Sequence, residues 1–370
     1  MPIDSKIRSI IKENGHIKID DMMREVLSAG SGSYYKSLKN IGENGDFITS
    51  PEISQLFGET IALWAIEKWQ QLGMPKRFSL IELGPGQGKL MQDFLRTAKL
   101  VPEFYNAIRI YLLEINPYFI KKQKASLTSY NKNIKWFTNI KKIPKTKAII
   151  IANEFFDALP IKQYMKVKNK WFELVLVVDP IDGRIKYQKT ELHKALQHQF
   201  LLEHIRSQDG AIIEESVESL NIIRFLSKHL CTYGGAGIII DYGYNIKTEN
   251  RTRGQYNSTL QAIKNHQYHS IIDSLGEADL TAHVDFNALK KAAIEQGINN
   301  HNILSQKEFL VKYGIEMRLQ ELKNTASREE SDVLDRQVFR LTSDKQMGKL
   351  FKALEIFSPK LKKLMSNTAN

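Results

Sequence analysis

This sequence of 370 residues contains one cysteine and no long apolar run. Cys231 cannot form a disulfide within the chain, and we expect it to be a core thiol in a buried helix end rather than a nucleophile. The longest apolar runs, at 148–152 and 237–240, are far shorter than the roughly 20 residues that span a bilayer. The sequence therefore predicts no membrane insertion.

The first residues also lack the composition of a targeting peptide. Acidic side chains at positions 4, 13, 20 and 21 stand among the basic ones, whereas mitochondrial transit peptides are poor in acids. We expect a cytoplasmic protein.

Two kinds of catalytic centre are missing from the sequence. There is no G-x-S-x-G elbow of a serine hydrolase. His266 and His269 form the only close pair of histidines, and no cysteine or acidic cluster beside them completes a tetrahedral site. We expect neither a hydrolase triad nor a metal site.

Acidic residues are fewer than basic ones, which gives a formal net charge of +12. Such a charge can displace counterions from nucleic acid. The lysines are scattered through the chain, however, and no RNA-binding signature accompanies them. An acidic protein partner explains the charge equally well, so we favour a protein substrate over nucleic acid.

Strand and helix patterns alternate from residue 78 onward. Strands are predicted at 78–83, 109–115, 134–137, 147–153 and 236–241, which is the rhythm of a doubly wound, mostly parallel α/β sheet. A helical N-terminal region precedes them, and an antiparallel meander at 164–167, 171–178 and 184–189 interrupts them. Further helices are predicted at 192–206, 217–230, 285–296, 306–313 and 316–323, with a closing antiparallel strand at 350–357.

These patterns divide the chain into four consecutive ranges. Residues 1–75 form the helical N-terminal region, 76–160 the first half of a Rossmann-like core, 161–232 the inserted antiparallel and helical subdomain, and 233–370 the second half of the core. Within the first range, Ser50 is expected to cap one helix that continues to Trp69, because Pro51 suits its first turn and Glu52 suits its dipole.

A glycine loop follows the strand at 78–83. Its glycines are Gly84, Gly86 and Gly88, so the third arrives one residue too early for the nicotinamide pattern G-x-G-x-x-G, and the surrounding residues do not fit a phosphate P-loop. Pro85 removes one amide donor from the turn, which suits a ligand without a pyrophosphate.

Glu114 ends the next strand, where an acid usually accepts hydrogen bonds from ribose hydroxyls. Together with the glycine loop it predicts a site for S-adenosylmethionine. The alternative interpretation is a tight turn followed by a solvated acid.

Four motifs in this order resemble the MidA family of class I methyltransferases. They are GDFITSPEI at 45–53, ELGPGQG at 82–88, NEFFDALP at 153–160 and DLTAHVDF at 279–286. The resemblance covers nearly the whole chain and implies the class I fold and S-adenosylmethionine as cofactor. Members occur in bacteria and mitochondria. The mitochondrial ones are implicated in complex I assembly through symmetric dimethylation of an arginine, so the resemblance implies a bacterial NADH dehydrogenase subunit as a substrate.

An arginine methyltransferase needs acids at the mouth of its cofactor pocket, because a guanidinium nitrogen is a poor nucleophile until carboxylates orient it. Glu154 follows the fourth predicted strand, where known arginine methyltransferases carry a glutamate pair, and is the first candidate to bind substrate. Asp157 is the second, although it could instead cap a turn. Asn153 could contact the substrate or the cofactor.

His283 is a candidate base for the departing proton, with a structural histidine as the alternative, and Asp285 could cap the following helix. Asp241 is expected to face the pocket mouth. The expected cofactor contacts are Glu82, Gly84, Pro85, Gly86, Gly88, Glu114, Asn153, Thr49 and Ser50, with Asp46 beside them.

Three functions are compatible with these residues. The first is protein arginine N-methylation. The second is methylation of a small molecule or an RNA, of which RNA is disfavoured by an acidic pocket mouth. The third is a non-catalytic assembly chaperone that binds S-adenosylmethionine.

Overall fold

The computed structural model describes residues 2–27, 33–34, 48–130, 132–247, 250–252 and 255–361. The chain forms two compact units, of which the first comprises 1–47, 157–221 and 244–287 and the second 48–156, 222–243 and 288–370. Each of the four consecutive ranges expected from the sequence contributes residues to both units, because each unit collects segments that are far apart along the chain.

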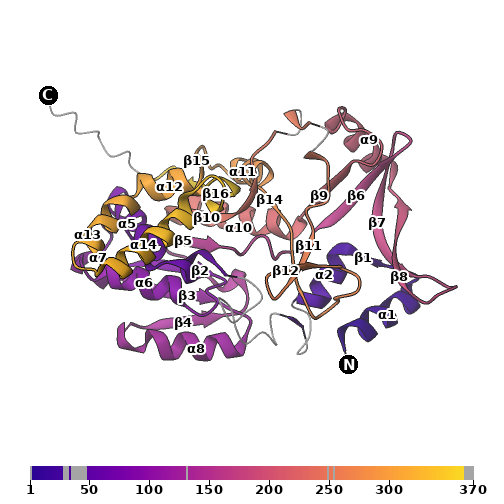
Figure 1. Ribbon diagram of the computed structural model, residues 1–370. Coiled ribbons are helices and arrows are strands. Elements are labelled where there is room, and N and C mark those ends of the chain that lie inside the picture. The colour runs from indigo at the N-terminus through magenta and orange to yellow at the C-terminus, as the bar shows by residue number, and fades with distance from the viewer. Residues whose placement is uncertain are drawn as a thin grey trace. The chain divides into compact units, whose positions relative to one another are not determined.

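The second unit is built on a sheet with the strand order β15-β16-β10-β5-β2-β3-β4 (Figure 1). Five neighbouring strands are parallel, whereas β16 is antiparallel to β10 and to β15. The strands are β2 (Phe78–Leu83), β3 (Ile108–Leu113), β4 (Ile134–Phe137), β5 (Ala148–Asn153), β10 (Gly235–Tyr244), β15 (Asn300–Ser305) and β16 (Phe351–Phe357). The doubly wound, mostly parallel sheet and its closing antiparallel strand are confirmed.

The strand order reverses at β2. From β2 the chain moves outward through β3 to β4 and then returns to place β5 on the other side of β2. Both β2 and β5 are buried along their whole length, as expected for apolar central strands of a parallel sheet. Ligands of such sheets bind beyond the carboxyl ends of the strands at the point of reversal. The ends of β2, β3 and β5 are therefore the place to look for the site.

The helix expected from Ser50 to Trp69 is two helices, α4 (Ser50–Ile53) and α5 (Gln55–Gln71). Ser54 separates them because it is extended, with φ −153°, and its hydroxyl accepts a hydrogen bond from the Leu56 N–H. The predicted Ser50 cap is wrong, because Thr49 precedes the first turn without a side-chain cap. The Ser50 N–H instead donates to Glu154 Oε1, 2.8 Å away.

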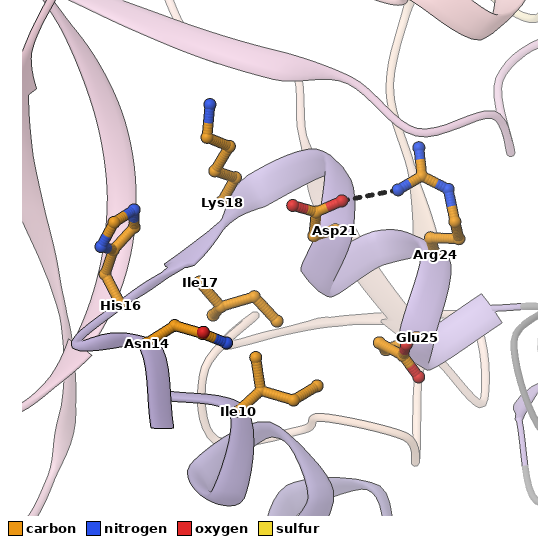
Figure 2. Close-up of a pocket in the computed structure, with 8 residues that line it drawn as sticks. All are labelled: Ile10, Asn14, His16, Ile17, Lys18, Asp21, Arg24 and Glu25. Carbon is orange, nitrogen blue, oxygen red and sulfur yellow. Dashed lines mark hydrogen bonds and ion pairs between the residues drawn. The ribbon is translucent and has the colours of Figure 1, made fainter. Parts of the chain in front are cut away.

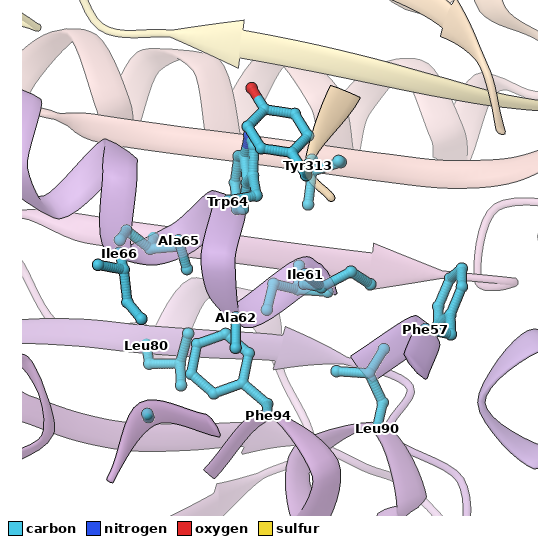
Figure 3. Close-up of a cluster of buried hydrophobic side chains, with 14 of the residues drawn as sticks. Phe57, Ile61, Ala62, Trp64, Ala65, Ile66, Leu80, Leu90, Phe94 and Tyr313 are labelled. Atoms are coloured by element: carbon cyan, nitrogen blue, oxygen red, sulfur yellow. The ribbon is translucent and has the colours of Figure 1, made fainter. Parts of the chain in front are cut away.

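The core of this unit lies between α5, the sheet and α6 (Lys89–Ala98). Figure 3 shows Phe57, Ile61 and Trp64 of α5 together with Leu80 of β2 and Phe94 of α6, all fully buried. These apolar residues of α5 are therefore core positions. Burying such side chains is worth about 1.5–3 kcal/mol each before the entropy cost of ordering.

The remaining described helices of the second unit are α7 (Pro102–Ala107), α8 (Pro117–Leu127), α12 (Gln306–Lys312), α13 (Ile315–Lys323), α14 (Arg328–Thr342) and α15 (Met347–Leu350), with short 3₁₀ turns at Thr128–Tyr130 and Ile140–Lys142. Among them, α8 and α12 directly follow strands of its sheet. Two further helices have residues in both units. They are α10 (Val217–Tyr233) and α11 (Phe286–Ile294). Cys231 lies in the last turn of α10 and is half-buried.

The first unit combines the N-terminal helices with the predicted meander. Its larger sheet has the order β1-β7-β6-β9 with β8 also paired to β7, and its smaller one the order β12-β11-β13. The helices are α1 (Ile3–Asn14), α2 (Ile19–Leu27) and α9 (Lys194–Glu203). The strands are β1 (Ile17–Lys18), β6 (Lys162–Val167), β7 (Lys170–Val178), β8 (Ile185–Glu191), β9 (Ile212–Glu215), β11 (Gln261–Lys264), β12 (Gln267–His269), β13 (Asp279–Thr281) and β14 (Val284–Asp285).

The meander β6–β8 and the flanking helices agree with the sequence expectation, whereas β9, the β11–β13 sheet, β15 and α14 were not anticipated. Among the described residues, no helix is long and apolar enough to cross a membrane.

Candidate active site

The glycine loop connects β2 to α6 through three left-handed residues. Gly84, Gly86 and Gly88 have φ values of 64°, 52° and 83°, which other residues adopt only with strain. A Cβ on Gly84 would lie 2.9 Å from the Phe155 ring, and one on Gly88 would lie 3.2 Å from Gln123 Cγ. Two of the three glycines therefore also allow neighbouring segments of the chain to approach the loop.

Glu114 follows the end of β3 and is 7% exposed. Its Oε1 accepts a hydrogen bond from the Asn116 N–H at 2.8 Å, and its Oε2 accepts one from Gln123 Nε2 at 3.2 Å. Burial raises the pKa of this carboxyl to about 7, although these donors oppose the shift. A carboxylate offers about four acceptor positions, so acceptor capacity remains for the hydroxyls of a ribose.

Glu82 lies in β2 and is 3% exposed. Its Oε2 is buried and has no hydrogen-bond partner among the described residues. Burial and then the neighbouring charge of Glu114 raise the pKa of Glu82 to about 8. Strongly perturbed acids of this kind gather at functional sites, and this one stands directly before the glycine loop.

The strand end at β5 carries a third pair of polar residues. Asn153 is the last residue of β5, and its buried Oδ1 has no hydrogen-bond partner within the described part of the chain. Its Nδ2 donates to Glu154 Oε1 at 3.1 Å. Glu154 has a positive φ of 47°, a strained conformation for a residue with a Cβ. Such strain at a strand end is typical of sites where a side chain is held in place for a ligand.

Asp241 stabilises this strained turn rather than facing the mouth of a pocket. It is fully buried in β10, and its Oδ2 accepts hydrogen bonds from the backbone N–H groups of Phe155 and Phe156 at 3.2 and 3.0 Å. The Glu154 N–H donates to the Ile240 carbonyl at 2.9 Å. Asp241 was expected to face the pocket mouth, but its carboxylate is fully buried and accepts hydrogen bonds from the backbone after β5.

Ser50 lies next to Glu154 but is fully buried. Its N–H contacts Glu154 and its hydroxyl contacts Gln306 Oε1 at 3.4 Å. Thr49 is half-buried at the start of α4. Asp46 lies outside the described residues.

Asp157 and His283 belong to the first unit, whereas Glu154 belongs to the second. The backbone carbonyl of Asp157 accepts a hydrogen bond from the Ala282 N–H, so the segments that carry Asp157 and His283 lie side by side. The His283 N–H donates to Thr259 Oγ1 at 2.9 Å. Asp285 ends β14 and forms an ion pair with Arg251 at 2.6 Å.

A separate cavity of about 300 Å³ lies among the N-terminal elements (Figure 2). Its lining residues are Ile10, Asn14, His16, Ile17, Lys18, Asp21, Arg24 and Glu25. Arg24 and Asp21 form an ion pair at 2.7 Å. No residue expected to bind cofactor lines this cavity.

The residues at the ends of β2, β3 and β5 fit S-adenosylmethionine. Glu114 has acceptor capacity for ribose hydroxyls. The buried Oε2 of Glu82 and Oδ1 of Asn153, which have no partner among the described residues, could accept hydrogen bonds from donors such as an ammonium group. The turn at Gly84 and Gly86 leaves the backbone accessible, because Gly84 is exposed and Gly86 half-buried. The arrangement defines a nucleoside-binding α/β protein of the methyltransferase type.

The chain belongs to a family of S-adenosylmethionine-dependent methyltransferases. Residues 60–304 match the model of the family described as "Putative S-adenosyl-L-methionine-dependent methyltransferase". This match confirms the resemblance to the MidA family and the cofactor, S-adenosylmethionine.

Curated relatives are similar over most of the chain. A mitochondrial protein arginine methyltransferase NDUFAF7 from Xenopus tropicalis is 32% identical over 94% of this chain and 83% of its own. The protein of the same name from Homo sapiens is 32% identical over 87% of this chain and 76% of its own. A crystal structure from Burkholderia thailandensis bound to S-adenosyl-homocysteine has a TM-score of 0.85 at 23% identity, covering 98% of this chain and 93% of that one. It confirms the fold.

Proposed function

We propose that this protein is a protein arginine N-methyltransferase in which Glu154 binds the acceptor guanidinium. The position of Glu154 carries the proposal. Its carboxylate follows the central strand β5 directly, and its backbone is held in a strained conformation by Asp241 and Ile240. Its Oε1 is oriented by the Ser50 N–H and the Asn153 amide. A surface acid without a function needs none of these contacts.

The chemistry explains why an acid is required there. When bound, S-adenosylmethionine supplies a methyl group that is electrophilic because it is attached to a sulfonium. A guanidinium keeps its proton at any ordinary pH. A carboxylate that accepts its N–H groups fixes its plane and draws positive charge away from the reacting nitrogen. Glu154 is proposed to do this for the acceptor.

The acceptor nitrogen also has to lose one proton when it gains the methyl group. His283 is proposed to accept this proton, and Asp157 is the second candidate for contacting the acceptor. Catalysis by these residues is mainly positioning, because transfer requires the acceptor about 3 Å from the methyl carbon.

The names of the relatives support arginine as the acceptor, since those relatives are called protein arginine methyltransferases. The family resemblance suggests an arginine of a respiratory NADH dehydrogenase subunit, methylated in a bacterial cytoplasm. A negatively charged Glu154 disfavours an RNA acceptor because it would repel phosphates.

The test is methyl incorporation from labelled S-adenosylmethionine into protein from a matching lysate, followed by hydrolysis and analysis of methylated amino acids. We expect label in methylarginine. Glu154→Gln keeps the size of the side chain but loses its charge, and we expect incorporation to fall by about 100-fold. Binding of S-adenosylhomocysteine by this variant should stay within about tenfold of wild type. Glu295→Gln, at an exposed acid, is the matched control.

Three other outcomes would contradict the proposal. Label in RNA or in a small molecule would establish the second function instead. Binding of S-adenosylhomocysteine without any incorporation would favour an assembly chaperone. Methylarginine produced at the wild-type rate by Glu154→Gln would remove Glu154 from the mechanism.

A further inference from the structure

Gln123 of α8 lies behind the glycine loop and was not anticipated from the sequence. Its side chain is fully buried. Nε2 donates to the Gly86 carbonyl at 2.6 Å and to Glu114 Oε2 at 3.2 Å. Oε1 accepts a hydrogen bond from Trp136 Nε1 of β4 at 2.7 Å. One amide thus connects the loop after β2, the acid after β3 and strand β4.

Trp136 fixes which way the amide points. An indole N–H can only donate, so the atom that faces it has to be the amide oxygen. The amide nitrogen then faces Gly86 and Glu114, which both accept. Each of its two hydrogens has one acceptor, so the orientation satisfies all three partners at once.

The backbone of the loop is shaped to admit this side chain. Gly88 has no Cβ, and a Cβ there would come within 3.2 Å of Gln123 Cγ and 3.7 Å of its Cα. The third glycine is therefore needed for the approach of α8 as well as for the left-handed turn. A long polar side chain at a site of such close approach is expensive to bury unless its hydrogen bonds are made.

We propose that Gln123 is a positioning residue of the cofactor site, whose amide holds the Gly86 carbonyl and the Glu114 carboxylate in the arrangement that binds the nucleoside. It acts through these two groups. The proposal rests on the cofactor alone and is independent of the methyl acceptor.

The proposal has a consequence for the pH dependence of binding. Glu114 has to be ionised to accept hydrogen bonds from two hydroxyls. The groups around its carboxyl are Glu82 from β2, which disfavours the charge, and the N–H groups of Ile115, Asn116 and Gln123, which favour it. Removing the Gln123 donor should raise the pKa of Glu114, so that nucleoside binding is lost at a higher pH than in wild type.

The experiment is calorimetric titration of S-adenosylhomocysteine into wild type and Gln123→Met from pH 6 to 9. Methionine has a similar length and no amide. We expect the Kd of Gln123→Met to rise about tenfold at pH 7. When the pH is lowered from 9, the variant should begin to lose affinity at a higher pH than wild type does. Gln163→Met is the matched control, because Gln163 is 2% exposed and its Nε2 donates to Glu214 at 2.8 Å and Ser258 at 2.7 Å in the first unit.

A purely structural Gln123 gives a different result. The unfolding temperature of Gln123→Met would fall, as for Gln163→Met, while the Kd and its pH profile stayed within twofold of wild type. That outcome overturns the proposal. Should Gln123→Met fail to fold, Trp136→Phe keeps an aromatic ring at this position and removes the donor that orients the amide. We expect it to weaken binding in the same direction, and an unchanged Kd would overturn the proposal equally.

Discussion

Two glutamates on the same sheet are buried in opposite ways. Glu355 of β16 is fully buried and accepts hydrogen bonds from Trp64 Nε1, Tyr313 OH and Asn302 Nδ2 at 2.8, 2.9 and 3.0 Å, with Lys312 3.4 Å away. Glu82 of β2 is 3% exposed and leaves one oxygen without a partner among the described residues. The Glu355 side chain is surrounded by donors, whereas burial and then the charge of Glu114 raise the pKa of Glu82 to about 8.

We propose that the difference separates an acid that stabilises the fold from one that binds a ligand. Burying a carboxylate costs several kcal/mol unless donors replace the lost water. At Glu355 the protein provides these donors from four separate positions. At Glu82 none of the described residues donates to Oε2, so this cost is not offset within the described part of the chain. The comparison predicts that removing charge destabilises the protein at one position and stabilises it at the other.

The largest effect is expected for Glu355→Gln. The variant keeps one acceptor but places its amide N–H₂ against two donors, either Trp64 and Tyr313 on the Oε1 side or Asn302 and Lys312 on the Oε2 side. We expect the free energy of unfolding to fall by about 3 kcal/mol or more, measured by urea denaturation. The exposed Glu295→Gln should change it by less than about 0.5 kcal/mol. A loss below 1 kcal/mol would show that the hydrogen bonds to Glu355 contribute little to the stability of the fold.

A smaller effect, on binding rather than folding, is expected for Glu114→Ala. Removal of the carboxylate should weaken S-adenosylhomocysteine binding by about 1–3 kcal/mol, the worth of hydrogen bonds to a charged group, measured by calorimetry. An analogue that lacks the ribose 2′-hydroxyl should lose less affinity on the same substitution. Equal losses for both ligands would mean that Glu114 does not contact the ribose.

The cofactor loop could be predicted from sequence because its information is local. Three glycines, one preceding strand and an acid after the next strand are all readable within about 35 residues. The strands of the sheet could be predicted for the same reason, since β2 and β5 are short apolar runs bounded by turns. Hydrogen bonds between segments that are far apart in the sequence produce no such local pattern.

The contacts that position the site come from such distant segments. Gln123 looks like any polar residue on an amphipathic helix until α8 brings it against Gly86, 37 residues away. Asp241 resembles a strand-end acid, but its partners lie 85 and 86 residues away in the turn after β5. The helix from Ser50 was expected to continue to Trp69 because apolar residues recur along it, and only the extended φ of Ser54 reveals the break.

The smallest effect is expected for Glu82→Gln at pH 9, and its sign is opposite to that of Glu355→Gln. The pKa of Glu82 is raised in the folded state from 4.5 to about 8. Between these values the folded protein binds the extra proton, so the unfolding free energy of wild type falls as the pH rises through this window. Glutamine carries no such proton. We therefore expect Glu82→Gln to be less stable than wild type near pH 5, by about 1–3 kcal/mol, because its amide is unpartnered and the wild-type carboxyl keeps its proton there. At pH 9 wild type has lost the stabilisation linked to that proton, so we expect the variant to be more stable by about 1–2 kcal/mol.

Thermal unfolding of the ligand-free protein at pH 5, 7 and 9 measures this difference, and S-adenosylhomocysteine binding of the same variant completes the comparison. When a residue binds a ligand at a cost in stability, its substitution should stabilise the protein and weaken binding. Glu82→Gln should therefore bind S-adenosylhomocysteine more weakly than wild type. If the variant were less stable than wild type at pH 9, Glu82 would be satisfied within the folded chain as Glu355 is. The contrast between the two acids would then reflect their neighbours in the sheet rather than a ligand.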